Sequence, residues 1–191
     1  MSLGDRFPQV LEAARGGEQW ALTALYRELQ PPLLAYLRSR CPRDAEDVAQ
    51  ETWIDVARAL GRFVGGEPDF RRLVFVIGKR RTIDQMRRAS AGPTEPLPDG
   101  SNPVSALGDA EQEAIERLSA EEAVAAVAAI LSPEHAEIVL LRVLGGFSAE
   151  EVAVIMGKKP STVRSLQHRA IRRLAVALSP EGATSPMRRA M

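Results

Sequence analysis

The sequence predicts an all-α protein built from two small helical domains. Aromatic residues make up only 5% of its 191 residues, whereas β-strands favour aromatic and β-branched side chains. Long stretches are instead rich in Ala, Leu, Glu and Arg, which are strong helix formers. The stretch from Ala89 to Pro103 is rich in Pro, Gly and Ser and has no apolar period. We therefore expect two helical domains joined by a flexible linker.

The linker sets the expected domain boundaries. Residues 1–89 are assigned to the N-terminal domain, residues 90–112 to the linker and residues 113–178 to the C-terminal domain. The last segment, 179–191, contains Pro, Ser and Gly and follows the last stretch with a helical apolar period. We expect this tail to be disordered, because chain ends that bury little apolar surface are poorly ordered.

Four helical segments are expected in the N-terminal domain. The first runs from Phe7 to Arg15 and is stopped by the glycine pair that follows it. The second runs from Gln19 to Arg40. We expect it to break at Pro31-Pro32, because proline lacks the N–H group that an α-helix needs.

Each of the other two segments combines an apolar face with a charged one. Residues 44–60 place apolar side chains at helical spacing, and the glycine-rich stretch 61–66 ends that helix. Its apolar face comprises Val48, Trp53, Val56 and Leu60. Residues 69–88 form the next helix, with arginines on its exposed side. The residues that it is expected to bury are Val74, Ile77 and Ile83.

The C-terminal domain is expected to begin with an acidic helix at residues 110–130, followed by a helix at residues 133–144. The sequence Ser148-Ala-Glu-Glu151 is a capping box, in which serine and glutamate satisfy each other's backbone N–H groups. It should start a helix of about two turns that ends at Gly157, because glycine accepts positive φ. Pro160 then fits the first position of the last helix.

A short helix, a glycine-containing turn and a longer basic helix form a helix-turn-helix, whose second helix enters the DNA major groove. Residues 158–173 contain six basic residues and no acidic residue. A helix that is merely solvated would usually carry acids as well, so this composition favours DNA binding. An ordinary pair of antiparallel helices with a solvated charged face is the other interpretation of the same pattern.

A second basic segment lies in the N-terminal domain. Residues 71–88 contain seven basic residues against the single acid Asp84. Arg81 is spaced to form an intrahelical ion pair with Asp84, whereas the other arginines near the end of this segment have no such obvious partner. Because the net charge of the whole chain is zero, this segregation of charge suits local contacts with phosphate groups.

Little in the sequence supports an enzyme. Neither of the two histidines, His135 and His168, lies near a plausible nucleophile or carboxylate pair, and no phosphate loop or metal-ligand spacing is present. We expect no catalytic residue, no cofactor and no metal. The single cysteine, Cys41, is expected to be a small core residue. No stretch has the roughly 18 to 20 apolar residues that span a bilayer, so we expect no membrane insertion and a cytoplasmic location.

Three motifs together resemble the sigma-70 family of bacterial transcription initiation factors. Residues 44–53 are similar to the family's polymerase-binding helix, residues 70–88 to its promoter-opening helix and residues 131–170 to its C-terminal promoter-reading domain. The promoter-opening helix carries Leu73 and Arg80 where members often have Trp and Asn. The order of the motifs, and a linker where the family has one, resemble the group IV, or ECF, sigma factors.

The resemblance implies a factor that binds core RNA polymerase, directs initiation at promoter DNA and assists strand opening. The residues implied to contact the clamp helices of the polymerase β′ subunit are Asp47, Gln50, Glu51 and Asp55. Those implied to lie along the minus-ten element are Arg80, Arg81, Asp84, Arg87 and Arg88. Those implied to read the minus-thirty-five element are Ser161, Thr162, Arg164, Ser165, His168 and Arg169. The C-terminal domain would also touch the β flap, and an anti-sigma factor is a further expected partner.

A stand-alone helix-turn-helix regulator is the alternative hypothesis. It would bind its promoter tightly without polymerase, and it leaves the acidic residues within 44–55 without a role. A sigma factor instead holds two linked domains on DNA once polymerase joins, because linkage raises the effective concentration of the second contact. The free protein is then expected to bind DNA weakly.

Overall fold

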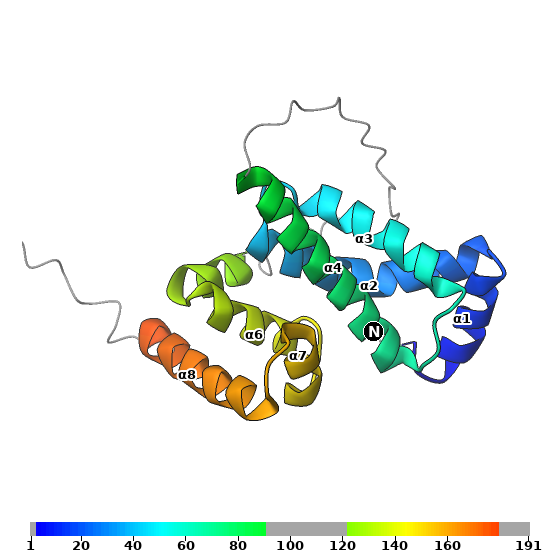
Figure 1. The fold of residues 1–191 in the computed structure, drawn as a ribbon. Helices are drawn as coiled ribbons and strands as arrows, with labels where there is room; N and C mark the ends of the chain where they lie inside the picture. The colour runs from blue at the N-terminus through cyan, green and yellow to red at the C-terminus, as the bar shows by residue number, and fades with distance from the viewer. Residues whose placement is uncertain (1–2, 91–121, 180–191) are drawn as a thin grey trace, which may run out of the picture.

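The computed structural model describes residues 3–90 and 122–179, and every regular element within these ranges is helical. The helices are η1 (Gly4–Arg6), α1 (Phe7–Arg15), α2 (Gln19–Arg40), α3 (Ala45–Leu60), α4 (Glu67–Ser90), α6 (Pro133–Val143), α7 (Ala149–Met156) and α8 (Pro160–Leu178). Residues 122–130 are helical as well. Figure 1 shows α1 to α4 as one group and α6 to α8 as another. The predicted fold class is confirmed, while most of the predicted linker and tail lie outside the described residues.

The N-terminal group is held together by the apolar faces of α2, α3 and α4, with α1 packed on α2. The predicted apolar face of α3 is confirmed for Val48, Val56 and Leu60, which are buried. Trp53 is only partly buried, and its Nε1 donates a hydrogen bond to Gln30 Oε1 of α2 (2.6 Å). Cys41, which follows α2, is buried as expected.

The expected break at the two prolines of α2 is wrong. The helix runs without interruption from Gln19 to Arg40 and contains both Pro31 and Pro32. Each proline removes one backbone hydrogen bond. Leu29 and Leu33 on either side of the pair are buried, so tertiary packing offsets the lost bonds and keeps the helix continuous.

The buried side of α4 differs from the prediction at one position. Val74 is fully buried and Ile77 is partly buried, but Ile83 is 39% exposed. Thr82 is buried instead, and its hydroxyl donates to the carbonyl of Gly78 (3.0 Å). Because Val74, Gly78 and Thr82 recur every fourth residue, they form the stripe that faces the core. The backbone bond allows a threonine to replace the expected apolar residue.

The helix-turn-helix forms as the sequence predicts. Glu151 N donates to Ser148 Oγ (3.2 Å), and Ser148 N donates to Glu151 Oε2 (2.7 Å), which completes the capping box at the start of α7. Gly157 ends α7 with a φ of +63°. Pro160 occupies the first turn of α8. The buried side of α8 packs on α6 and α7.

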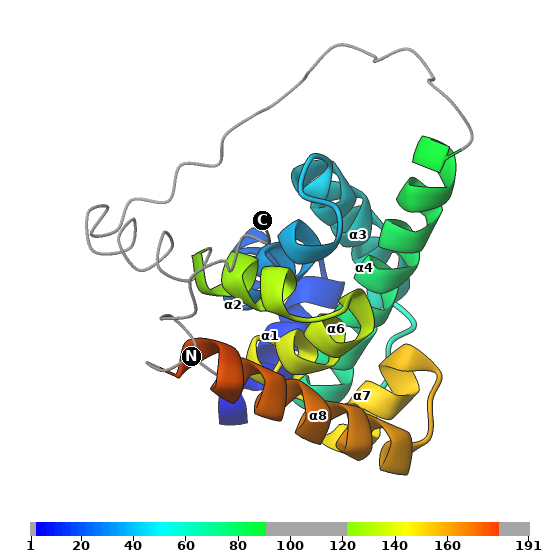
Figure 2. The ribbon, with the colours of Figure 1, turned by 90° about the vertical axis from the view of Figure 1, so that its left-hand side faces the viewer.

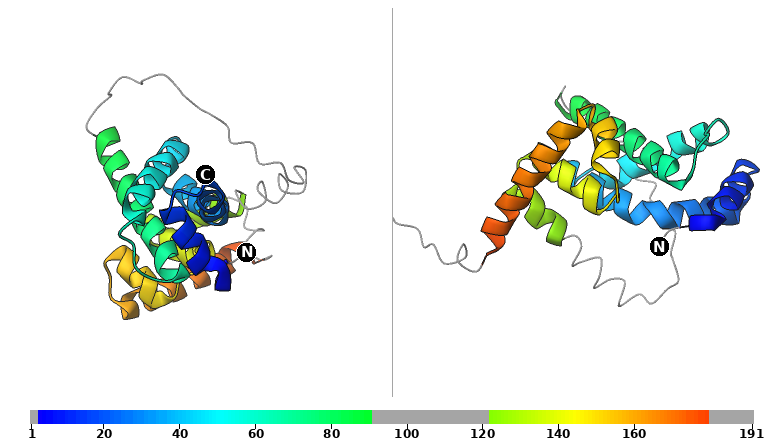
Figure 3. Two further views of the ribbon diagram at one scale, coloured as in Figure 1. Left: turned by 90° about the vertical axis from the view of Figure 1, so that its right-hand side faces the viewer. Right: turned by 90° about the horizontal axis from the view of Figure 1, so that it is seen from below.

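The two helix groups also pack against each other, which nothing in the sequence indicated. α4 contacts α7 and α2 contacts α6, and the turned views show α6 and α7 lying against the N-terminal group (Figures 2 and 3). Phe147 meets Phe75 of α4 edge to face, with ring centroids 5.0 Å apart. A side chain on Gly145 would overlap the Phe147 ring, so glycine permits this arrangement. One apolar core therefore spans both groups.

Replacing Ser148 with alanine removes one of the two reciprocal bonds of the capping box. We expect the free energy of unfolding to fall by about 1 kcal/mol, with a lower Tm in thermal denaturation followed by circular dichroism. Ser161→Ala is the matched control, because Ser161 is an exposed serine in the first turn of α8. It should change stability by less than about 0.5 kcal/mol. Equal losses in the two variants would contradict a stabilising role for the box.

Candidate nucleic-acid interface

The outward side of α8 carries every residue that the sequence analysis assigned to it. All six side chains are exposed, whereas Val163 and Ala170 of the same helix are fully buried. The six are Ser161, Thr162, Arg164, Ser165, His168 and Arg169. Burial of Val163 and Ala170 therefore fixes the rotation of α8 so that its polar residues face solvent.

Arg172 extends this surface. The sequence analysis counted it in the basic segment 158–173 but did not assign it to the site. Arg172 is exposed and follows His168 by four residues and Arg164 by eight, so it lies on the same side of the helix. The four-residue spacing was a signal that could have identified it. With Arg172, the cationic surface continues into the second half of α8.

Acidic residues of neighbouring helices pair with the cations of this region. Arg164 forms an ion pair with Glu150 of α7, and both side chains are largely exposed. Lys158, in the turn before α8, lies 2.6 Å from Glu134 of α6. The hydrogen bond from Lys158 lowers the pKa of Glu134. Any ligand that bound Arg164 would therefore have to replace the Glu150 carboxylate.

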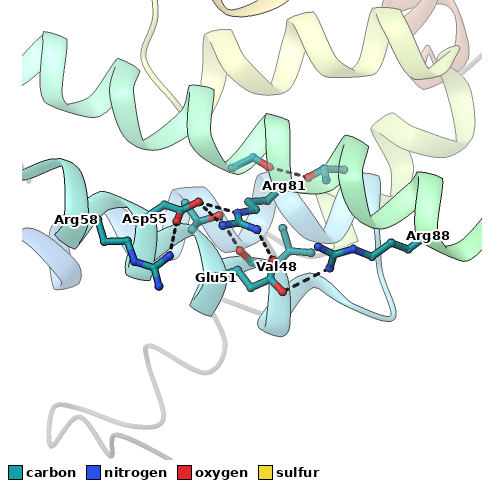
Figure 4. A network of polar contacts seen from close by, with 9 residues as sticks. Val48, Glu51, Asp55, Arg58, Arg81 and Arg88 are labelled. Atoms are coloured by element: carbon teal, nitrogen blue, oxygen red, sulfur yellow. Dashed lines mark hydrogen bonds and ion pairs between the residues drawn. The ribbon is translucent and has the colours of Figure 1, made fainter. Parts of the chain in front are cut away.

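Between α3 and α4, a network of charged residues joins the predicted polymerase-binding residues to the predicted minus-ten residues (Figure 4). Arg81 of α4 donates from Nε to Asp55 Oδ2 (2.7 Å) and from Nη1 to Glu51 Oε2 (3.1 Å). The predicted ion-pair partner Asp84 is thus replaced by two acids of α3. Arg88, which was expected to have no obvious partner, lies 3.6 Å from Glu51.

This network changes the roles that the paired residues can play. The hydrogen bond from Arg81 lowers the pKa of Asp55, and the same bond raises the pKa of Arg81. Arg81 and Asp55 are partly buried and hold α4 against α3. Asp47 and Gln50 of α3 are exposed instead, and Asp47 has no ion-pair partner among the described residues. They remain available to a partner.

A cavity of about 760 Å³ lies between the end of α3, the turn at residues 61–66 and α4. Its lining includes Arg80, Arg81 and Asp84, three of the predicted minus-ten residues, and also Leu73. The sequence analysis missed Arg62 and Phe63, which the turn contributes. Flanking glycines mark this turn in the sequence, but only the fold brings it beside α4. The cavity thus combines guanidinium groups, the carboxylates of Asp55 and Asp84, and apolar walls.

The described ranges contain no metal-binding cluster beside these charged surfaces. They contain no group of three or more His, Cys, Asp or Glu side chains that could hold a metal ion. His135 is partly buried, and its Nδ1 lies 2.7 Å from Ser132 Oγ. Arg87 and His168 are exposed. Every described helix is too short or too polar to cross a membrane.

Comparison with protein families identifies the class to which this arrangement belongs. The chain matches the family model for Sigma-70 region 2 over residues 25–92 and that for Sigma-70, region 4 over residues 121–174. The first match contains α3, α4 and the cavity, and the second contains the helix-turn-helix. The fold is thus that of a sigma-70-type transcription initiation factor.

Similarity to individual proteins shows to which group of sigma-70-type factors the chain belongs. The chain is 33% identical to the ECF RNA polymerase sigma factor SigD of Mycobacterium tuberculosis, over 90% of this chain and 83% of the relative. It is 35% identical to the ECF RNA polymerase sigma factor ShbA of Streptomyces griseus, over 83% of this chain and 87% of the relative. The chain therefore belongs to the ECF sigma factors of the sigma-70 family, which direct transcription.

A solved structure supports the same fold. CnrH, in complex with the cytosolic domain of CnrY, superimposes with a TM-score of 0.60 and 24% sequence identity. The match covers 95% of this chain and all of the CnrH chain.

The family match favours a polymerase-dependent factor over the stand-alone regulator that the sequence analysis left open.

The α3–α4 network should make stability depend on pH. The pKa of Asp55 lies below its ordinary value of 3.8, so its stabilising effect is complete above that value and is lost as pH falls through the folded-state pKa. Urea denaturation should show the largest difference between wild type and Asp55→Asn near about pH 7 and a smaller one near about pH 3. Glu12→Gln, which removes an exposed carboxylate on α1, is the control. A difference independent of pH would contradict this role.

Proposed function

We propose that this chain binds core RNA polymerase and directs it to promoters with a minus-thirty-five and a minus-ten element. The observation that carries the proposal is the outward side of α8, which presents six polar or cationic residues on a helix without an acid. The chain also has a second cationic helix beside a cavity. Relatives named as RNA polymerase sigma factors support polymerase as the partner.

The first half of α8 reads the minus-thirty-five element in the major groove, which is wide enough to admit an α-helix. Arg164 and His168 lie one turn apart on its exposed side and reach base edges. Arg169 and Arg172, further along the helix, contact phosphates. The residues before and after this surface help to orient the helix on the DNA but do not distinguish one base from another.

The minus-ten element is held at the cavity beside α4. An unstacked base needs an apolar surface against its ring, and stacking on an aromatic side chain contributes about 1–3 kcal/mol per base. Phe63 and Leu73 supply apolar surface, and Arg62 and Arg80 supply charge for the adjoining phosphates. Capture of a base in this cavity offsets the cost of unstacking it and so assists strand opening.

Polymerase is contacted by the exposed acidic side of α3. Asp47 and Gln50 touch the clamp helices directly. Glu51 and Asp55 contribute by fixing Arg81, so that the polymerase-binding helix and the minus-ten helix move as one unit. The C-terminal domain, at residues 113–178, adds a contact with the β flap.

An anti-sigma factor is a further proposed partner. CnrH, whose fold this chain shares, is solved in complex with the cytosolic domain of CnrY. We extend that mode of regulation to this chain by analogy. Such a partner acts by keeping one or both DNA-binding surfaces away from the promoter.

Arg164→Ala should weaken promoter recognition without affecting polymerase binding. Loss of one base contact is expected to cost about 1–3 kcal/mol, or roughly tenfold or more in affinity. Binding of the reconstituted holoenzyme is measured on a promoter selected from random DNA by the wild-type holoenzyme. Arg173→Ala removes an exposed arginine nine residues further along α8 and should have a smaller effect. Similar losses in both variants would contradict base reading by Arg164.

Asp47→Lys should weaken polymerase binding without affecting promoter recognition by the bound factor. The substitution reverses charge at an exposed position that has no ion-pair partner among the described residues, so folding should be little changed. Affinity for core polymerase, measured by fluorescence anisotropy, is expected to fall by roughly tenfold or more, because a charge at the interface becomes repulsive. Glu12→Lys on α1 is the control for added positive charge. Normal core binding by Asp47→Lys would remove α3 from the proposed polymerase interface.

A further inference from the structure

The turn that lines the cavity is held from α1, a helix that none of the proposed interfaces uses. Arg15, the last residue of α1, donates from Nε to the carbonyl of Leu60 (3.5 Å) and from Nη2 to the carbonyl of Phe63. Leu60 ends α3, and carbonyls in the last turn of a helix have no partner within it. One guanidinium therefore joins the end of α3 to the turn that follows, beside which Figure 1 shows α1.

The side chain of Phe63 is attached to α1 as well, through a second aromatic residue. Its ring centroid lies 5.4 Å from that of Phe70, in the first turn of α4. The Phe70 centroid in turn lies 5.9 Å from that of Phe7 of α1. Phe7 and Phe70 are buried and Phe63 is partly buried, so the three rings form a row from the core to the cavity wall. α1 thus supports both the backbone and the ring of Phe63.

The turn depends on such support because of its composition. Three of the six residues at 61–66 are glycine, and glycine gives the backbone more conformational freedom than any other residue. At the end nearest to α4, Gly66 N donates to Asp69 Oδ2 (3.1 Å). Arg15 binds the other half of the turn, which carries Arg62 and Phe63 into the lining of the cavity.

We propose that Arg15 is a positioning residue of the minus-ten site, which holds Arg62 and Phe63 at the cavity wall before DNA arrives. The inference rests on the proposed function, since it assumes that this cavity takes an unstacked base. Arg15 is not part of the cavity lining, so it acts through the turn and not by touching DNA. A turn that is already ordered binds more tightly, because binding no longer has to order it.

The test compares full-length wild type with Arg15→Met, which keeps a helix-forming side chain but removes the N–H donors. Holoenzyme made with each factor is titrated with a fluorescent single strand that carries the non-template minus-ten sequence of a promoter selected by the wild-type holoenzyme. Affinity for this strand should fall roughly five- to tenfold, while affinity for core polymerase stays unchanged. Arg27→Met removes an exposed arginine of α2, outside the cavity lining, and should bind the strand as the wild type does.

The salt dependence of binding separates positioning from direct contact. Loss of one phosphate contact reduces the slope of log affinity against log salt concentration by about 0.7 for a single strand. Arg15→Met should keep the wild-type slope, whereas Arg62→Met, which removes a proposed phosphate contact, should reduce it. Unchanged affinity in Arg15→Met, or a slope reduced as in Arg62→Met, would overturn the positioning role.

Amide hydrogen exchange in the free factor tests the turn without DNA. Arg62 N donates to the carbonyl of Ala59 (3.0 Å) and Phe63 N to that of Leu60 (3.2 Å). Both amides should exchange faster in Arg15→Met, because the turn opens more often. Equal exchange in wild type and variant would overturn the link between Arg15 and the turn.

A wild-type holoenzyme that bound the minus-ten strand no better than a scrambled strand would instead refute the proposed function. The positioning role would fall with it, while hydrogen exchange would still report whether Arg15 holds the turn.

Discussion

The rest of the structure depends on α4, because this helix must satisfy different neighbours on each of its sides. Val74, Gly78 and Thr82 face the core of the N-terminal group. Phe75 and Lys79, one position further on, face the C-terminal group. A third side carries Arg81 and Arg88 to the acids of α3, and Arg80 and Arg81 both border the cavity. Shifts of one residue along the sequence thus separate the side that packs in the core from the sides that meet the C-terminal group and α3, as the helical repeat of 3.6 residues allows.

Charge pairing explains how a chain with no net charge can hold two cationic surfaces. Arg81, Arg88 and Arg164 each lie beside an acid from a neighbouring helix. The pairs of Arg88 and Arg164 are largely exposed, and exposed pairs contribute little to stability. An anionic ligand would therefore replace these acids at small cost. Arg81 is less accessible and has two acidic partners, which makes it a structural residue of the α3–α4 contact. The difference in burial therefore separates residues that position a helix from residues that can bind.

Local signals in the sequence were sufficient for most helices, because caps, glycines and apolar periods act within a few residues. The capping box, Gly157 and Pro160 gave the helix-turn-helix directly. Long-range packing decided the rest: it kept α2 helical through Pro31 and Pro32 and chose Thr82 over Ile83 for the core. The acids of α3 that bind Arg81 and the ring that Phe147 meets lie 26 or more residues away in the chain. No pattern of sequence spacing indicates such pairs, so the sequence placed the candidate residues on their helices but did not indicate their partners.

The surface that polymerase is proposed to use lies apart from the contact between the two helix groups. α3 packs on the side of α4 away from the C-terminal helices (Figure 1), and Asp47 and Gln50 are exposed while the two groups are in contact. The acids of α3 that pair with Arg81 face α4 instead. The same helix therefore offers one acidic side to a partner and uses another to hold the fold together.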